Sequence, residues 1–392
     1  MLFQSVGARY DLHDALAHAL TIGKQSDSAH LKNELEKRYR GHVALYRKGR
    51  AALAEAVRIA TNGSGKVAIC GFTCYSVVEA VEAAGCTPVY IDIDRDTLNF
   101  TAENLQAAFR THADIHAVVV QNSLGIACDI EAIERVASAN QALLIEDLAH
   151  SAGATYASGQ EVGTVGDITM LSMGRDKALD CVNGGALIVR RAELIVQMHE
   201  PKQFVRAIDQ LRDRLYPLIA WKTRVLFPLG VGKYILGFAY KSGLAIRSAD
   251  GGVHPQEAMP NWLAKRAARE LLRLSETNHQ RRQVLNLYAA ELREYIVPGT
   301  LKDGAVPIRV PLYVRSRARV LAALKARGYF VEDVWYDRPV SPARLYKKVD
   351  YPEADNSVST EVARQIMNLP THAGVRPEHI AEMAQIIREE SV

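Results

Sequence analysis

Short apolar runs and amphipathic stretches alternate along the first half of the chain. The apolar runs are typical of buried strands and lie at 66–70, 88–93, 117–121, 142–146, 168–172 and 186–190. The amphipathic stretches predict helices and lie at 29–39, 50–60, 76–84 and 130–139. Strands that alternate with helices favour a mostly parallel sheet with both faces covered. This half of the chain therefore predicts the α/β class.

The second half predicts a smaller α/β unit. One long helix is expected at 264–295 and a strand at 307–314, and further helices are expected at 320–327, 361–367 and 377–389. A chain of 392 residues is long for a single domain. We therefore predict an N-terminal arm and large domain at 1–253 and a small C-terminal domain at 254–392.

An apolar and basic insert interrupts the large domain at about 197–253. Its segment 215–244 is rich in aliphatic and aromatic residues, and its charged residues are all positive: Lys222, Arg224, Lys233 and Lys241. These charges, together with Pro217 and Pro228, argue against a membrane-spanning helix. Helices packed on the body of the protein or at a dimer interface are the simpler interpretation. Peripheral contact of 215–244 with a membrane surface is the alternative.

The bulk composition excludes several classes of protein. Hydrophobic residues make up 48% of the chain and charged residues 23%, as in soluble globular proteins. A net charge of +4 is too small to imply a nucleic-acid partner. The five scattered cysteines indicate reduced thiols in the cytoplasm, and their spacing predicts no metal site. The first ten residues lack the basic and apolar blocks of a signal peptide.

Asp147 and Lys177 are the residues that point to chemistry. Asp147 ends an apolar strand, where ligands of α/β sheets bind, although an aspartate there also serves as a helix N-cap. Lys177 lies in a short polar loop between two predicted strands, close to the core, where its amine is expected to have a lowered pKa. An amine that forms an imine and a carboxylate that holds a pyridine nitrogen protonated are what a pyridoxal phosphate (PLP) enzyme needs.

Gly49 and Arg50 open a predicted helix and supply backbone N–H groups that suit a phosphate. An ordinary helix start has the same sequence pattern. The Ser172 hydroxyl, at the end of a predicted strand, offers a further phosphate contact.

Together these segments resemble the DegT/DnrJ/EryC1/StrS family of fold type I PLP enzymes, mostly sugar aminotransferases. The similar segments follow in the family's order: 49–53, 71–73, 88–94, 124–130, 145–154, 163–168, 172–177 with Gly184-Gly185, and 368–370. The resemblance implies a mostly parallel sheet sandwiched by helices plus a smaller C-terminal α/β domain. It also implies a homodimer with the site at the subunit interface.

The resemblance assigns roles residue by residue. It implies that Lys177 forms the imine with PLP, that Asp147 pairs with the pyridine nitrogen, and that His150 lies near the phenolic oxygen of the ring. Ser172 and the amides of Gly49 and Arg50 would hold the phosphate. Cys74 falls where the family has the aromatic residue that stacks on the ring, and Tyr75 is our candidate to replace it. Gln256 takes the place of a residue that reaches the phosphate from the partner subunit.

The reaction implied is transamination from an amino acid, with glutamate as the family's donor, to a keto-sugar in nucleotide-sugar metabolism or polysaccharide biosynthesis. Two alternatives stay open: a sugar dehydratase of the same family, and a non-catalytic relative with a binding or regulatory role. The dehydratases have histidine at the position of Lys177, which argues for transamination. The substrate-side motifs of the family are missing, and Trp335-Tyr336-Asp337-Arg338-Pro339 replaces one of them.

Overall fold

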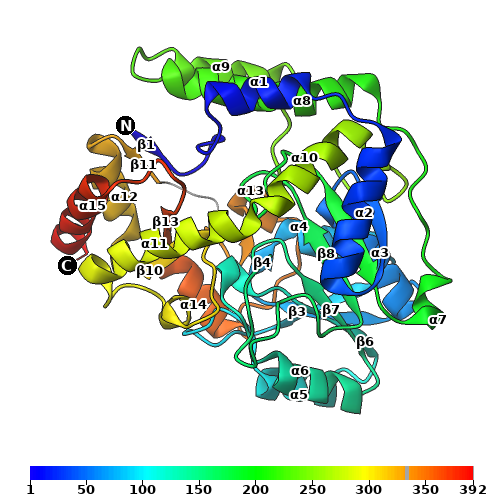
Figure 1. Ribbon diagram of the computed structural model, residues 1–392. Coiled ribbons are helices and arrows are strands. Elements are labelled where there is room, and N and C mark those ends of the chain that lie inside the picture. The colour runs from blue at the N-terminus through cyan, green and yellow to red at the C-terminus, as the bar shows by residue number, and fades with distance from the viewer. Residues whose placement is uncertain (332–334, 392) are drawn as a thin grey trace.

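A seven-stranded sheet forms the centre of the computed structural model, which describes residues 1–331 and 335–391 (Figure 1). In spatial order its strands are β2 (His42–Tyr46), β9 (Gly185–Val189), β8 (Ile168–Ser172), β7 (Leu143–Asp147), β6 (Ile115–Val120), β3 (Lys66–Cys70) and β5 (Thr87–Ile91). All neighbouring strands pair in parallel except β9, which is antiparallel to both β2 and β8. The predicted mostly parallel sheet is confirmed.

Helices cover both faces of this sheet. On one face, α3 (Gly49–Thr61) and α4 (Tyr75–Ala83) enclose a core with the strands. The other face packs against α2 (Gln25–Tyr39), α5 (Ala102–Thr111), α6 (Ile130–Ala139) and α10 (Asn261–Leu272). The strands are apolar on both sides because both sides are buried. The fold is therefore the predicted α/β sandwich.

The C-terminal part forms a second core around a small antiparallel sheet. That sheet pairs β10 (Arg309–Tyr313) with β13 (Ile366–Pro370), and α11 (Leu274–Leu292), α12 (Arg317–Ala326) and α15 (Pro377–Glu390) pack around it. The N-terminal strand β1 (Leu2–Phe3) joins this part by pairing with β11 (Tyr329–Phe330). The first residues of the predicted N-terminal arm therefore pack with the C-terminal part. The predicted domain boundary between residues 253 and 254 stays a prediction.

Two predicted helices differ from the structure. The long helix at 264–295 is broken at Arg273 into α10 and α11, because α10 packs on α2 while α11 packs on α15. The helix predicted at 361–367 is α14 (Ser357–Gln365), which ends where Ile366 begins to pair with Tyr313 across the small sheet. In both regions a tertiary contact overrides the local pattern.

The insert folds as a pair of helices, as the simpler interpretation predicted. These are α8 (Ala207–Val225) and α9 (Gly232–Lys241), and α1 (Leu12–Leu20) packs against α8. The three helices form a layer along the top of Figure 1. No helix within the described residues is long and apolar enough to cross a membrane.

Short elements complete the chain. They are β4 (Thr73–Cys74), which pairs with β12 (Val340–Ser341), the helices α7 (Ala192–Ile195) and α13 (Ala343–Tyr346), and the 3₁₀ turns η1 (Ser123–Gly125) and η2 (Pro298–Leu301).

Candidate active site

A cavity of about 980 Å³, open to solvent, lies at the carboxyl ends of β7 and β8. The parallel register of these strands brings their ends to one edge of the sheet, which is where ligands of such sheets bind. Seven of the predicted site residues line this cavity together: Gly49, Arg50, Cys74, Asp147, His150, Ser172 and Lys177.

Asp147 is the last residue of β7, and its carboxylate is buried at the cavity. One carboxylate oxygen accepts a hydrogen bond of 2.8 Å from the amide of Ala149. Burial raises the pKa of Asp147 to about 6, while the Ala149 amide and the Lys177 ammonium act in the opposite direction. A cationic ligand nitrogen beside this carboxylate would keep it ionised.

Lys177 reaches the same cavity from the loop after β8. Its Nζ lies 3.3 Å from Nε2 of His150 and 3.6 Å from the centre of the Trp335 ring. Burial lowers the pKa of Lys177 to about 8, with Cys74 and Asp147 opposing the shift. At neutral to mildly alkaline pH a substantial share of this amine is therefore unprotonated and nucleophilic.

His150 is a neutral ring in this structure. Its Nδ1 accepts a 3.2 Å hydrogen bond from the amide of Leu124, so the ring proton lies on Nε2, which faces Lys177. Burial, and then the Lys177 charge, hold the pKa of His150 well below its usual value. The site thus contains a hydrogen-bond donor fixed beside the reactive amine.

The first turn of α3 makes the other end of the cavity. A Cβ added at Gly49 would lie 2.7 Å from the Ser172 Oγ, so only glycine lets the helix start approach β8 this closely. This first turn carries no acidic side chain. Helix N-terminal amides beside a hydroxyl suit an anion such as phosphate. A carboxylate at one end, a lysine amine between and an anion cradle at the other end fit PLP.

Comparison with known proteins agrees with this geometry. The family model of the DegT/DnrJ/EryC1/StrS aminotransferase family matches residues 32–224 and 253–388. The chain belongs to this family. The unmatched stretch between the two matched ranges falls within the insert that carries α9.

Individual relatives are distant in sequence and close in fold. The GDP-perosamine synthase of Caulobacter vibrioides is 24% identical over 338 residues, which cover 85% of this chain and 81% of the relative. A family aminotransferase structure from Brucella abortus superposes with a TM-score of 0.70 at 19% identity, covering 97% of this chain and 94% of that one. Spr1654 of Streptococcus pneumoniae in its PLP form gives 0.73 at 16% identity, covering 100% and 98%. The predicted cofactor agrees with that PLP form.

Two predicted site residues of this aminotransferase-family chain lie elsewhere. Tyr75 does not line the cavity, and its ring packs with the core on the α4 side, 5.9 Å from the Lys348 Nζ. Because Cys74 and Tyr75 are consecutive at the start of α4, their side chains point in different directions, and only Cys74 faces the cavity. The geometry therefore does not support Tyr75 as the ring-stacking residue.

Gln256 is exposed and does not line the cavity of its own chain. Its carbonyl accepts a hydrogen bond of 2.9 Å from the amide of Gln203. Its predicted place in the site of a partner subunit stays a prediction.

Arg50 has a role in this aminotransferase fold that its sequence pattern did not reveal. Its guanidinium donates to Glu79 over 2.6 Å, to the Ala249 carbonyl over 3.2 Å and to the Ser248 carbonyl. Ser248 and Ala249 belong to the segment after α9 and line the cavity. The side chain thus fixes the insert at the cavity wall, while its amide stays at the helix start.

Among the cavity residues that were not predicted as site residues, three stand out. Trp335 and Tyr336 stood out only as a departure from the family, yet Trp335 lies over Lys177 and packs 4.7 Å from the His150 ring, centre to centre. Gln121 follows β6 at the same edge of the sheet and accepts a 2.7 Å hydrogen bond from Thr73. Because Gln121 directly follows a parallel strand, the sequence could have indicated it as a site residue.

A second cavity adjoins Lys177. Its lining has both signs of charge, with Asp14, Asp176 and Asp180 beside Arg9, Arg273, Arg281 and Arg309. Burial, together with the nearby Arg9 and Arg309 charges, lowers the pKa of Arg281 to about 9. An anionic group bound in this cavity would relieve that repulsion.

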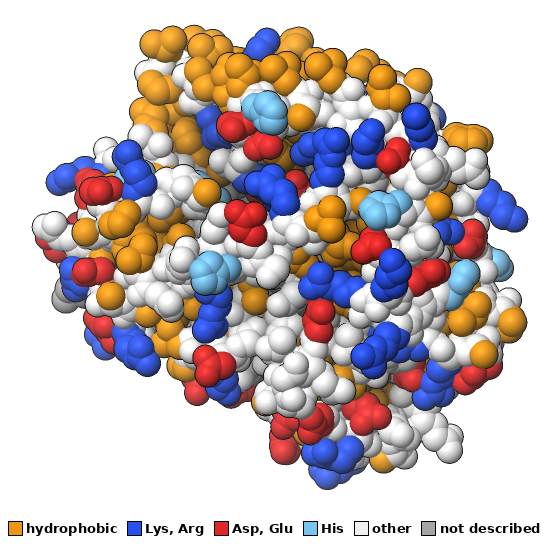
Figure 2. Space-filling view, viewed as in Figure 1, with side chains coloured by type: hydrophobic (Ala, Val, Ile, Leu, Met, Phe, Trp, Pro, Cys, Tyr) orange, Lys and Arg blue, Asp and Glu red, His pale blue; other side chains and the backbone are white. Residues whose placement is uncertain are grey.

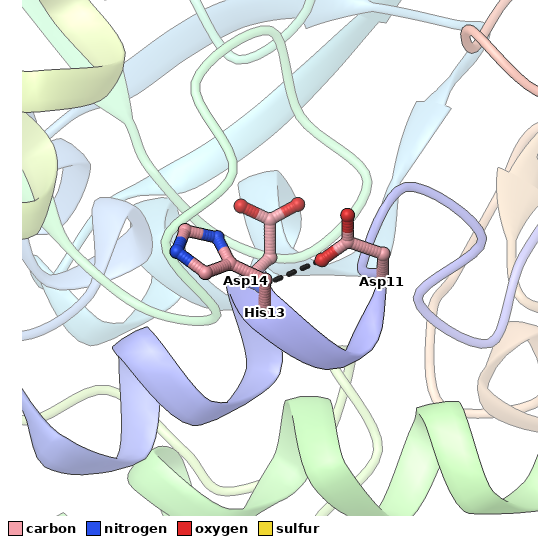
Figure 3. A group of neighbouring side chains, drawn as sticks. All are labelled: Asp11, His13 and Asp14. Atoms are coloured by element: carbon pink, nitrogen blue, oxygen red, sulfur yellow. Dashed lines mark hydrogen bonds between the residues drawn. The ribbon is translucent and has the colours of Figure 1, made fainter.

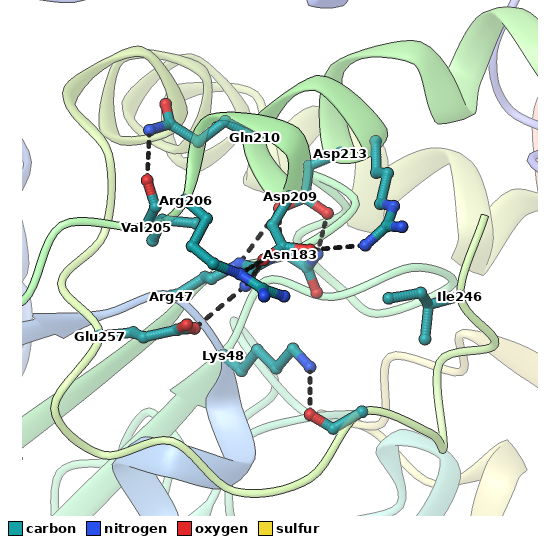
Figure 4. Close-up of polar contacts among 12 residues, drawn as sticks. Arg47, Lys48, Asn183, Val205, Arg206, Asp209, Gln210, Asp213, Ile246 and Glu257 are labelled. Carbon is teal, nitrogen blue, oxygen red and sulfur yellow. Dashed lines mark hydrogen bonds and ion pairs between the residues drawn. The ribbon is translucent and has the colours of Figure 1, made fainter. Parts of the chain in front are cut away.

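A buried polar network connects the insert to the loops around the site (Figure 4). Arg47, directly after β2, donates to Asp213 over 3.1 Å and to Glu257 over 3.0 Å. Asn183, on the loop that follows Lys177, donates to the other oxygen of Asp213 over 2.7 Å. α8 is therefore anchored to the cavity wall by ion pairs and hydrogen bonds, in addition to the packing of Tyr216 and Ala220 against Val182.

Among the described residues one group of acidic and histidine side chains is close enough to bind a metal: Asp11, His13 and Asp14, at the start of α1 (Figure 3). Asp11 acts as the N-cap of α1 by accepting a 2.7 Å hydrogen bond from the Asp14 amide. Capping accounts for Asp11, and Asp11 and His13 are exposed while Asp14 is half-buried.

Proposed function

We propose that this protein is a PLP-dependent aminotransferase that transfers an amino group from glutamate to a keto-sugar. The observation that carries the proposal is the single cavity that holds the Lys177 amine, the buried Asp147 carboxylate and the Gly49–Ser172 cradle. The family membership and the fold support the same reaction class.

When bound, PLP supplies an aldehyde that takes the amino group and a ring that accepts an electron pair. The residues of the chain do the rest. Lys177 would hold the cofactor through its Nζ. Once the amino donor has displaced it, the same nitrogen would take a proton from the carbon that bears the donor's amino group and deliver it to the cofactor carbon. Asp147 would stabilise a proton on the ring nitrogen, His150 would donate from Nε2 to the ring oxygen, and Gly49 with Ser172 would bind the phosphate.

The donor and the acceptor are inferred from different observations. The arginines in the cavity beside Lys177 could pair with a carboxylate group, which supports glutamate as the donor. The similarity to a GDP-perosamine synthase supports a sugar nucleotide as the acceptor.

We propose a cytoplasmic homodimer in which Gln256 reaches the phosphate of the partner's site. Its exposed position outside its own cavity supports this arrangement. The five cysteines form no disulfide in the structure, which suits a reducing compartment. The 215–244 segment is proposed as the part that contacts the membrane.

Two other functions are weighed against transamination. A sugar dehydratase of this family is disfavoured because Lys177 occupies the position of its histidine. A non-catalytic binding or regulatory protein is disfavoured because Lys177, Asp147 and His150 are brought together with perturbed pKa values.

Visible absorption of the purified protein loaded with PLP tests the proposal. We expect a band that bleaches when glutamate is added and returns when a keto-sugar nucleotide is supplied, with release of 2-oxoglutarate and an amino sugar. Lys177→Ala is expected to lose the band, and Lys202→Ala, at an exposed lysine, is the matched control. A band that is unchanged in Lys177→Ala, or one that glutamate does not bleach, would refute the assignment.

A further inference from the structure

The outward side of the α1, α8 and α9 layer is apolar. Its members are exposed apolar side chains from three segments: Leu12, Leu16 and Leu20 of α1, Ile208, Leu211 and Val225 of α8, and Leu229, Val231, Tyr234 and Phe238 of α9 and the turn before it. We call this set the outer face. Figure 2 shows hydrophobic atoms gathered in a continuous band along the top of the molecule, over these helices.

The buried side of α8 is partly polar, with aspartates beside the apolar Tyr216 and Ala220. Its inward positions include Asp209, Asp213 and Thr223, and Asp213 is held by Arg47 and Asn183 (Figure 4). Its leucines and isoleucines point to solvent or are half-buried. Apolar residues that the core does not use, gathered over three helices, indicate a surface that meets another apolar partner.

α1 also contributes exposed apolar side chains to the outer face. Its inward residues Ala15 and His18 are fully buried, and the His18 ring lies 5.3 Å from that of Trp262. Arg214 of α8 donates to the carbonyls of Ala19 and Thr21, which fixes α1 against the insert. Leu12, Leu16 and Leu20 follow at intervals of four, so they share one side of the helix.

The charges of the insert, which supplies most of the outer face, indicate its partner, and the exposed Asp11 lies at the α1 end of the face. The insert contains no aspartate or glutamate from 214 to 249, while it contains six lysines and arginines. Lys222, Lys233 and Lys241 are exposed on α8 and α9. A second copy of the chain seated on this face would bring the same cations against each other across a two-fold axis. A surface of anionic lipid headgroups above an acyl layer complements both the charge and the apolar side chains.

We propose that the outer face docks the protein on an anionic membrane surface. Leu229, Tyr234 and Phe238, which are 73%, 67% and 65% exposed, enter the headgroup–acyl boundary while the lysines meet the lipid phosphates. Ser248 and Ala249, just after α9, line the active-site cavity, so the docked protein holds this cavity beside the bilayer. The proposal does not depend on the reaction that the cavity performs.

Vesicle co-sedimentation of the full-length protein tests the proposal. We expect binding to phosphatidylglycerol-containing vesicles that weakens with salt, and much weaker binding to pure phosphatidylcholine vesicles. The triple variant L229S/Y234S/F238S is expected to bind at least about 100-fold more weakly, because each buried side chain contributes about tenfold. Replacing Lys222, Lys233 and Lys241 with serine is expected to remove the preference for anionic lipid, at about fivefold for each lysine.

The matched control is Val196→Ser, which removes an equally exposed apolar side chain that lies outside the three helices. Visible absorption and light scattering of the same preparations, without vesicles, report the cofactor site and the oligomeric state. Absence of vesicle binding, or binding unchanged in the triple variant, would overturn the proposal. So would a triple variant whose oligomeric state changes, because the face would then be an interface between copies. A missing cofactor band with intact vesicle binding would contradict only the proposed reaction.

Discussion

Helices α3 and α8 differ in how many of their apolar side chains are buried. α3 is enclosed almost completely, with Ile59, Val57 and their neighbours in the core and its first turn at the cofactor cradle. α8 turns its aspartates inward to Arg47 and Asn183 and leaves Ile208 and Leu211 exposed. Burial of α3 stabilises the fold and positions the cavity. The exposed apolar residues of α8 do neither. The contrast agrees with our proposals that the first helix serves folding and the cofactor site and that the second belongs to a contact surface.

The largest expected effect lies at the enclosed site. Asp147→Asn keeps the shape of the side chain and removes its charge, and we expect kcat to fall by about 10³-fold, as for loss of one preorganised electrostatic contact. Bound PLP, measured by absorption after gel filtration, is expected to stay within a small factor of the wild type. Asp129→Asn, at the N-cap of α6, is the control. A kcat within tenfold of the wild type would show that the carboxylate serves only to order the turn after β7, where it accepts from the Ala149 amide.

The same substitution on the two helices tests the comparison directly. Ile59→Ala in α3 is expected to lower the free energy of unfolding by about 3 kcal/mol, because it empties a fully buried position. Ile208→Ala in α8 is expected to change it by less than about 0.5 kcal/mol, because the side chain is 46% exposed. Urea unfolding followed by circular dichroism measures both. If both variants lost the same free energy of unfolding, the two isoleucines would contribute equally to stability and the proposed difference between α3 and α8 would be wrong.

Glycine substitutions in the enclosed helix α3 and in the exposed helix α9 test the comparison further. Gly49→Ala places a methyl group 2.7 Å from the Ser172 Oγ and 3.1 Å from its Cα, and we expect about tenfold weaker PLP binding by titration, equivalent to about 1.4 kcal/mol. Gly237→Ala in α9 meets no atom within 4 Å and is expected to stabilise the exposed helix by up to about 1 kcal/mol. Unchanged PLP affinity in Gly49→Ala would place the phosphate elsewhere.

The smallest effect concerns pH. Because burial lowers the pKa of Lys177 to about 8, the amine loses its proton through that pH, well below the usual range of a lysine. The rate at which apo-protein takes up PLP is therefore expected to rise with pH around a midpoint near 8 and to fall below it. Stopped-flow absorption measures this profile. A midpoint near 10.5, the ordinary lysine value, would mean that the amine is solvated in the apo-protein.

Much of the fold could be predicted from the sequence, and so could the site residues near the strand ends. Both depend on apolar runs that are visible locally in the sequence. The strands that end at Asp147 and Ser172 are apolar runs, and parallel pairing brings such ends to one edge. Lys177 follows one of these strands after a short loop, so its position was constrained as well. The break at Arg273 was not predictable, since the pattern continues and only the change of packing partner ends α10.

The sequence by itself determined the sheet, the family, and the meeting of an amine with a carboxylate, because strand order and loop length leave those side chains little freedom. Only the tertiary structure decided that Trp335 covers Lys177 and that Tyr75 points away from the cavity. It also decided that Arg50 donates hydrogen bonds to the segment after α9. Those contacts join residues far apart in the chain, where no local periodicity carries information. The exposure of Ile208 and Leu211 on α8 was decided in the same way, because a periodic pattern gives a helix two faces without saying which one is turned inward.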